Sequence, residues 1–128
     1  MMGRSTAAFA ADPRVAGKLD DAWLRTLNGT MSTYSGGDFD AALASTKALF
    51  DAGVDVLAST DVAVPAPNVG GLAHGASVHH ELQLLVQAGL TPLQALRSAT
   101  SLPANRFGLH DRGHLARGTA RRHDPCRR

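Results

Sequence analysis

Apolar residues recur at helical spacing along most of this chain, between polar positions and breaks that contain Gly or Pro. A spacing of three or four residues places apolar side chains on one face of a helix. The Ala-rich stretch 4–11 is compatible with a helix, and Pro13 then restricts Asp12 to an extended conformation. The remaining pattern predicts helices over residues 20–31, 38–53, 77–89, 91–100 and 101–108.

Residues with strong preferences for helix ends mark several of these boundaries. Asp38 is expected to cap one helix and Gly53 to end it. Thr91 is expected to cap another, with Pro92 at the first helical position, where its missing N–H costs nothing. Gly108 is expected to end the last helix. The faces expected to be buried contain Phe39, Ala42, Leu43, Leu49 and Phe50 in the helix from Asp38, and Val78, Leu82, Leu85 and Val86 in the helix from Ser77.

The stretch 54–59, "VDVLAS", breaks the helical period. It is apolar, rich in valine and too short for a helix, and it directly follows a helix that ends in glycine. This order is typical of an α-to-β connection in an α/β fold. The sequence therefore predicts a short buried strand and an α/β class for a chain that is otherwise mostly helical.

Asp61 stands where this apolar run stops. Its carboxylate is either catalytic, at the end of a buried strand, or an ordinary turn residue, because Asp is common in turns. A Pro- and Gly-rich connection of about 16 residues follows, and long connections in compact domains are usually functional or disordered. His74 lies in this connection and is a weaker candidate for contact with a substrate, the alternative being a loop histidine bonded to the backbone.

The length and composition of the chain restrict the classes of protein to which it can belong. The 128 residues fit about one domain, and no apolar run is long enough to cross a membrane. The amino terminus lacks the apolar core of a signal peptide and Cys126 is the single cysteine, so we expect a cytoplasmic protein without a membrane partner. The net charge of +2 conceals an Arg-rich end with no interleaved aromatic residue, which we interpret as a solvated tail rather than a nucleic-acid site.

Three motifs follow one another in a fixed order: "VLASTD", which ends at Asp61, then "HHELQLLVQAGLTPLQALRSAT" and "PANRFGLHDRGHLARG". Together they resemble the carboxy-terminal part of the amidohydrolase superfamily, particularly its imidazolonepropionase-like and prolidase-like members. The resemblance extends over about residues 38–118 and is thinner over 10–37. It implies a (β/α)₈ barrel, in which catalytic groups lie at the carboxyl ends of the strands.

The resemblance also implies a chemistry. Asp61 would end the last barrel strand, where it would contact a divalent metal, with zinc expected, or act as general base toward the attacking water. The parent family hydrolyses C–N bonds in small-molecule amides, cyclic amides or dipeptides. His74 would contact the substrate.

The chain departs from the family pattern in two respects. No His-x-His precedes Asp61 and no histidine precedes His74, whereas a catalytic zinc takes three protein ligands. Neighbouring histidines such as His79 and His80 diverge by about 100° on a helix and do not form a chelating face. Furthermore, the strand residues that the family carries after residue 118 are replaced by the Arg-rich stretch 119–128, a change that a reading-frame shift would produce.

A complete barrel needs about 250 residues. We therefore expect a partial barrel over 1–118 and a disordered tail over 119–128. The chain alone is expected to retain neither the metal nor activity. It would then be an inactive truncated or pseudogene product, or a subunit that completes a split barrel with another chain or with further copies of itself.

Overall fold

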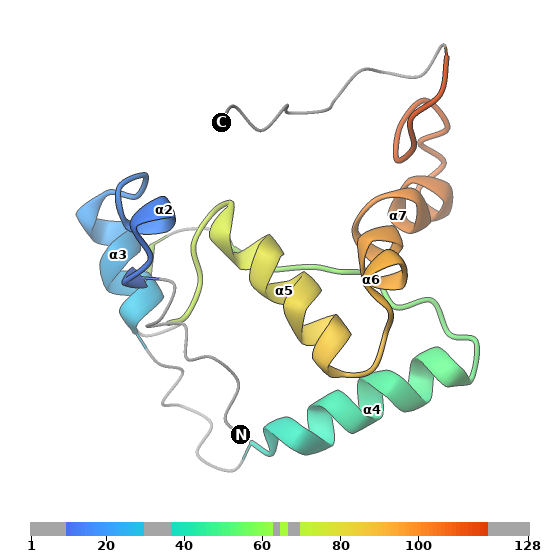
Figure 1. Cartoon of the computed structure of the whole chain (residues 1–128), viewed down its shortest axis with the longest axis horizontal. Coiled ribbons are helices and arrows are strands. Elements are labelled where there is room, and N and C mark those ends of the chain that lie inside the picture. Colours follow the sequence, from blue (N-terminus) through green and yellow to red (C-terminus); the bar gives the residue numbers. More distant parts are fainter. Residues whose placement is uncertain (1–9, 30–36, 63–64, 67–69, 118–128) are drawn as a thin grey trace. The chain divides into compact units, whose positions relative to one another are not determined.

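The computed structural model describes residues 10–29, 37–62, 65–66 and 70–117. The predicted helix over 4–11 and the tail 119–128 lie outside these ranges, apart from residues 10 and 11. The described part is mostly helical (Figure 1), and none of its helices is long and apolar enough to cross a membrane. In chain order the helices are α2 (Pro13–Ala16), α3 (Asp21–Asn28), α4 (Phe39–Asp51), α5 (Ala76–Gln87), α6 (Pro92–Ala99) and α7 (Ser101–Arg106).

The predicted helix ends are confirmed where a side chain bonds the neighbouring backbone. The carboxylate of Asp38 accepts the backbone N–H of Ala41 at 3.1 Å, at the start of α4. The hydroxyl of Thr91 accepts the N–H of Gln94 at 3.3 Å, while the Gln94 side chain accepts the N–H of Thr91 at 2.7 Å. These two reciprocal bonds form a capping box, with Pro92 at the first turn as expected.

Helix α2 begins at Pro13, directly after the extended Asp12. Asp12 is extended, as expected before proline, but its carboxylate accepts the backbone N–H of Arg14 at 2.9 Å and caps a short helix. Pro13 occupies the first turn, where a missing N–H is harmless. The Arg14 side chain also bonds this carboxylate, which lowers the pKa of Asp12 to about 2.

The predicted strand over 54–59 is wrong for the described part of the chain, which contains no strand. A strand needs a neighbour that pairs with its backbone, and the described residues bring none to this segment. Instead, the N–H of Ala58 donates to the carbonyl oxygen of Ser98 in α6 at 2.9 Å. Val56 and Ala58 pack against helices. The stretch is therefore an extended, half-buried segment, and the α/β class is not observed.

Residue contacts divide the chain into two compact units, each built from two separate stretches of sequence. The first unit comprises Met1–Ala41 with Ser59–Glu81, and the second comprises Ala42–Ala58 with Leu82–Arg128. In the second unit, Leu85, Leu90 and Ala95 form a buried apolar cluster. Partly buried hydrophobic residues pack around this cluster: Phe50, Val56, Ala58 and Leu82. In the first unit, the buried residues are Thr26, Leu27, Ala73 and Ser77.

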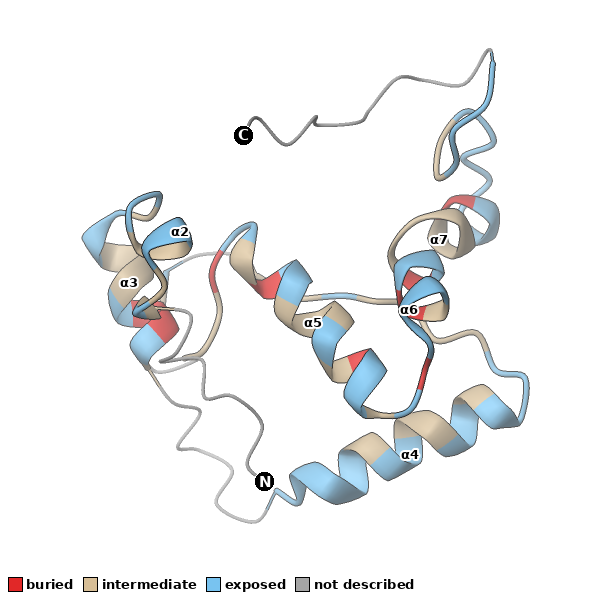
Figure 2. Cartoon of the chain, in the orientation of Figure 1, coloured by how far each residue is buried: buried red, intermediate tan, exposed pale blue. Residues whose placement is uncertain are grey.

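The apolar faces predicted for α4 and α5 are only partly buried (Figure 2). No residue of α4 is buried, and Phe39 and Leu49 remain 45% and 51% exposed. On α5, Leu85 is buried, whereas Val86 is 40% exposed. Hydrophobic periodicity predicts which side chains share a face, but burial also requires a surface that packs against that face. The described residues supply such a surface only around Phe50 and Leu85.

Candidate functional site

Asp61 follows the extended segment and is exposed to solvent. Its φ of 51° makes it the one non-glycine residue with a positive φ among the described residues. The left-handed region costs most residues roughly 1–2 kcal/mol, and Asp is among the few that enter it routinely. Such outliers concentrate at functional sites, and Asp is also common in turns. The structure therefore presents the Asp61 carboxylate to solvent from a left-handed backbone position.

His74 lies in the turn that precedes α5 and is exposed. Its imidazole meets the indole of Trp23, on α3, with ring centroids 4.5 Å apart and an angle of 69° between the planes. This is the edge-to-face arrangement that aromatic rings favour. The helix predicted over 20–31 contains Trp23, and nothing in the sequence connects this residue with His74. No local signal could do so, because 51 positions separate the two residues.

Two backbone contacts hold the elements that carry this ring pair. The N–H of Gly71 donates to the carbonyl oxygen of Thr26 in α3 at 2.8 Å. The N–H of Ala73 donates to the hydroxyl of Ser77 at 2.8 Å, at the start of α5. Thr26 and Ala73 are 2% and 0% exposed. The segment that leads into the turn of His74 is therefore bonded to α3 through Gly71, and the Ala73–Ser77 bond connects the turn to the start of α5.

A metal centre is not assembled by the described residues. No group of three or more His, Cys, Asp or Glu side chains there is placed to hold an ion. His80 and Glu81 are half-buried, and burial lowers the pKa of His80 and raises that of Glu81. Both shifts disfavour the charged form of the side chain.

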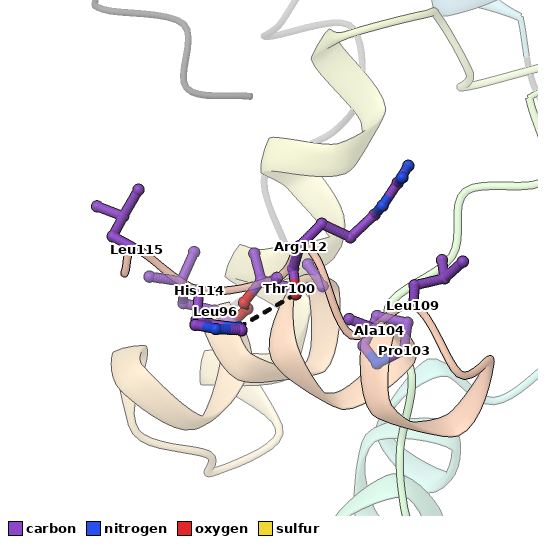
Figure 3. Close-up of a pocket in the computed structure, with 10 residues that line it drawn as sticks. Leu96, Thr100, Pro103, Ala104, Leu109, Arg112, His114 and Leu115 are labelled. Atoms are coloured by element: carbon purple, nitrogen blue, oxygen red, sulfur yellow. Dashed lines mark hydrogen bonds between the residues drawn. The ribbon is translucent and has the colours of Figure 1, made fainter. Parts of the chain in front are cut away.

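Two apolar grooves lie in the second unit. One has a volume of ≈ 550 Å³ (Figure 3) and is lined by Leu96, Ala99, Thr100, Pro103, Ala104, Leu109, Arg112, Gly113, His114 and Leu115. At its rim, the Nδ1 atom of His114 lies 3.2 Å from the carbonyl oxygen of Arg112, whose guanidinium pairs with Asp111. The other has a volume of ≈ 420 Å³, between α5 and α6. Neither groove includes Asp61 or His74.

Comparison with known proteins gives one partial relationship. No protein-family model matches the chain, and no solved structure matches it. Over 55 residues the chain is 49% identical to an adenine deaminase of Methanoregula boonei. The match covers 43% of this chain and 10% of that enzyme, so the chain spans about a tenth of the length of this relative. The match suggests a relationship, over that part of the chain, to the amidohydrolase superfamily.

Proposed function

We propose that this chain is part of a metal-dependent, amidohydrolase-type hydrolase that cleaves C–N bonds with water. The observation that carries the proposal is the 49% identity to an adenine deaminase over 55 residues. Deamination of adenine replaces a C–N bond by a C–O bond, and water supplies the oxygen. The ordered motifs after residue 55 resemble a family that acts on the same bond class. The substrate class is therefore a small molecule with a hydrolysable C–N bond, whether amide, cyclic amide, dipeptide or amino-substituted ring.

The proposed fold of the whole enzyme is the (β/α)₈ barrel. In such a barrel the segment 54–59 would become a strand, because neighbouring strands would then pair with its backbone on both sides. Those strands would come from outside the described residues or from another chain. The partner we propose is accordingly a complementing chain or a second copy of this one, in the cytoplasm, with neither nucleic acid nor a membrane involved.

Asp61 is the residue to which we assign the chemistry of this chain. An exposed carboxylate at the end of the extended segment is free to accept a proton from an attacking water molecule, as a general base does. His74, on the turn before α5, is assigned to contact with the substrate. A divalent metal would polarise the water, but the described residues do not by themselves form its site. The chain alone is accordingly expected to be inactive.

A chimera tests the function without requiring the chain to be active alone. In the M. boonei adenine deaminase, the region corresponding to residues 56–117 is replaced by those residues, and ammonia release from adenine is measured. We expect activity within about tenfold of the parent enzyme. Asp61→Asn in the chimera should lower kcat by roughly 10²–10⁴-fold, whereas Asp111→Asn, which removes an exposed carboxylate paired with Arg112, should leave it nearly unchanged.

A folded chimera that releases no ammonia would contradict the proposal, and equal activity of the Asp61 and Asp111 variants would remove Asp61 from the chemistry. Metal content of the intact chain distinguishes the alternatives for the chain itself. After dialysis with zinc, near-stoichiometric metal that is lost in Asp61→Asn would mean that copies of this chain build a site together. No retained metal would favour a complementing chain or an inactive product.

A further inference from the structure

The rings of Trp23 and His74 form two walls of a corner. Their planes are inclined by 69°, and their centroids are only 4.5 Å apart. In an edge-to-face pair, the edge of one ring meets the face of the other, so neither ring covers both faces of its neighbour. A flat molecule that stacks on one ring therefore brings its edge toward the other. Two parallel rings at this distance would cover each other instead.

The corner is fixed before any ligand arrives. Helix α3, which carries Trp23, is capped by Asp20, whose carboxylate accepts the Trp23 N–H at 2.9 Å. The buried bond between Gly71 and Thr26 ties the turn of His74 to the same helix. A binding element that is already ordered loses little conformational entropy when its ligand binds. Rigid aromatic rings on ordered backbone are suited to recognition.

The two residues are partly accessible to solvent. His74 is exposed and Trp23 is half-buried, so the pair is not part of a sealed core. Each ring adds polar atoms to its flat surface: indole Nε1 donates a hydrogen bond, and the two imidazole nitrogens donate or accept according to the tautomer. The corner thus offers stacking to the face of a ligand and hydrogen bonds to its edge.

We propose that Trp23 and His74 form a binding corner for a flat, nitrogen-containing aromatic ring of the nucleobase class. This inference rests on the proposed function for the view that the ligand is a substrate, and it narrows the substrate class. Nucleobases stack on aromatic side chains and carry ring nitrogens and amino groups for edge hydrogen bonds. Saturated cyclic amides and dipeptides have no aromatic face, so they gain no stacking in this corner. Trp23 and His74 would thereby select for aromatic substrates.

The composition of the chain permits a direct test, because Trp23 is its single tryptophan. Adenine is titrated into the intact chain, with excitation near 295 nm, where adenine absorbs little, and indole fluorescence is recorded. We expect saturable quenching by adenine and none by dihydrouracil or a dipeptide at equal concentration. His74→Ala should weaken adenine binding roughly tenfold to a hundredfold. His79→Ala is the matched control, because this exposed histidine on α5 lies outside the ring pair, and it should bind adenine as the parent chain does.

Trp23→Leu removes the indole ring and with it the fluorescence signal. Adenine binding by this variant is therefore measured by equilibrium dialysis with labelled adenine. Binding should again fall by at least tenfold, with helix content unchanged by circular dichroism. The absence of saturable quenching would overturn the proposal, as would equal binding of dihydrouracil or full binding by His74→Ala. None of these measurements requires turnover. Failure here alongside an active chimera rejects only the binding corner, and adenine binding alongside an inactive chimera rejects only the hydrolase.

Discussion

The guanidinium of Arg106, at the end of α7, pairs with the carboxylate of Asp55, 51 positions earlier in the chain. Three residues after Asp55, the N–H of Ala58 bonds the carbonyl oxygen of Ser98, which is 1% exposed. The two contacts attach the same extended segment to α7 and to α6. One of them is a buried backbone bond, and the other is an ion pair with side chains that are 30% and 65% exposed.

The ion pair should contribute little to stability. Because water screens exposed charges, Asp55→Asn and Arg106→Gln should each lower the free energy of unfolding by about 1 kcal/mol or less. The double variant should cost hardly more than either single variant, since the same interaction is removed only once. Urea unfolding at low and at high salt measures this, and a loss above about 2 kcal/mol that is insensitive to salt would show that the pair is far better shielded than its exposure indicates.

Gly113 and Gly53 form a matched pair for testing close packing. Their φ values are 84° and 79°, so an alanine meets the same backbone strain at both positions. At Gly53 a Cβ atom would meet nothing within 4 Å, whereas at Gly113 it would lie 2.6 Å from the Cβ of Ala104 and 2.8 Å from the carbonyl oxygen of Thr100. Gly53→Ala should cost roughly 1–2 kcal/mol, and Gly113→Ala about 1–3 kcal/mol more. Equal losses of Tm in the two variants would contradict the close contact at Gly113.

The capping box at the start of α6 gives a prediction about a single hydroxyl. Thr91→Ala removes the acceptor for the Gln94 N–H and should lower the free energy of unfolding by about 1 kcal/mol. Thr91→Ser keeps the oxygen and should retain most of the stability. Chemical denaturation of both variants tests the cap, and a loss of equal size in Thr91→Ser would point to the methyl group instead.

The single glutamate of the chain, Glu81, gives a prediction about pH. Burial raises its pKa above the ordinary 4.5, so the charged form is disfavoured in the folded state. The Glu81 carboxyl group therefore binds its proton more tightly in the folded chain than in the unfolded chain. At pH 7 the charged carboxylate lowers the free energy of unfolding, and this loss disappears as the pH falls through the pKa of the folded state. Glu81→Gln should stabilise the chain at pH 7 by up to about 0.5 kcal/mol.

The stabilisation by Glu81→Gln should be smaller at pH 4, where the carboxyl group of Glu81 is largely protonated in both the folded and the unfolded state. Asp40→Asn serves as the control, because Asp40 is an exposed acid in the first turn of α4, where negative charge is favourable. Asp40→Asn should lower the free energy of unfolding slightly at pH 7, whereas Glu81→Gln should raise it. Denaturation at both pH values checks this, and a Glu81→Gln variant that is less stable than the parent at pH 7 would mean that the carboxylate has favourable contacts in the folded state.

The sequence predicted the helices well because their signals are local. Asp38 and Thr91 bond backbone groups three residues away, and Gly89 and Gly108 have the positive φ values, 108° and 68°, that helix ends favour. The expectation that Pro13 holds Asp12 extended is confirmed. The short helix α2 that begins there was not predicted, because it depends on the Asp12 carboxylate accepting the N–H of Arg14.

Features that depend on residues far apart in the chain could not be predicted from the sequence. The valine-rich stretch 54–59 has the composition of a strand, but strand formation requires a partner, and in the described residues the backbone of Ala58 bonds a helix instead. The contact of Trp23 with His74 joins residues far apart along the chain and left no local trace. The role of Asp61 stays a prediction, since catalysis depends on which groups surround the carboxylate.

The division into two units has a consequence for biosynthesis. Each unit combines an early and a late stretch, since residues 1–41 belong with 59–81 and residues 42–58 with 82–128. A ribosome releases the chain from its amino terminus, and domains tend to fold as they emerge. The first unit can close only once residue 81 has left the exit tunnel, and α4 must wait still longer for Leu85 and Leu90. During that interval Phe50 on α4 lacks the later residues that pack against it.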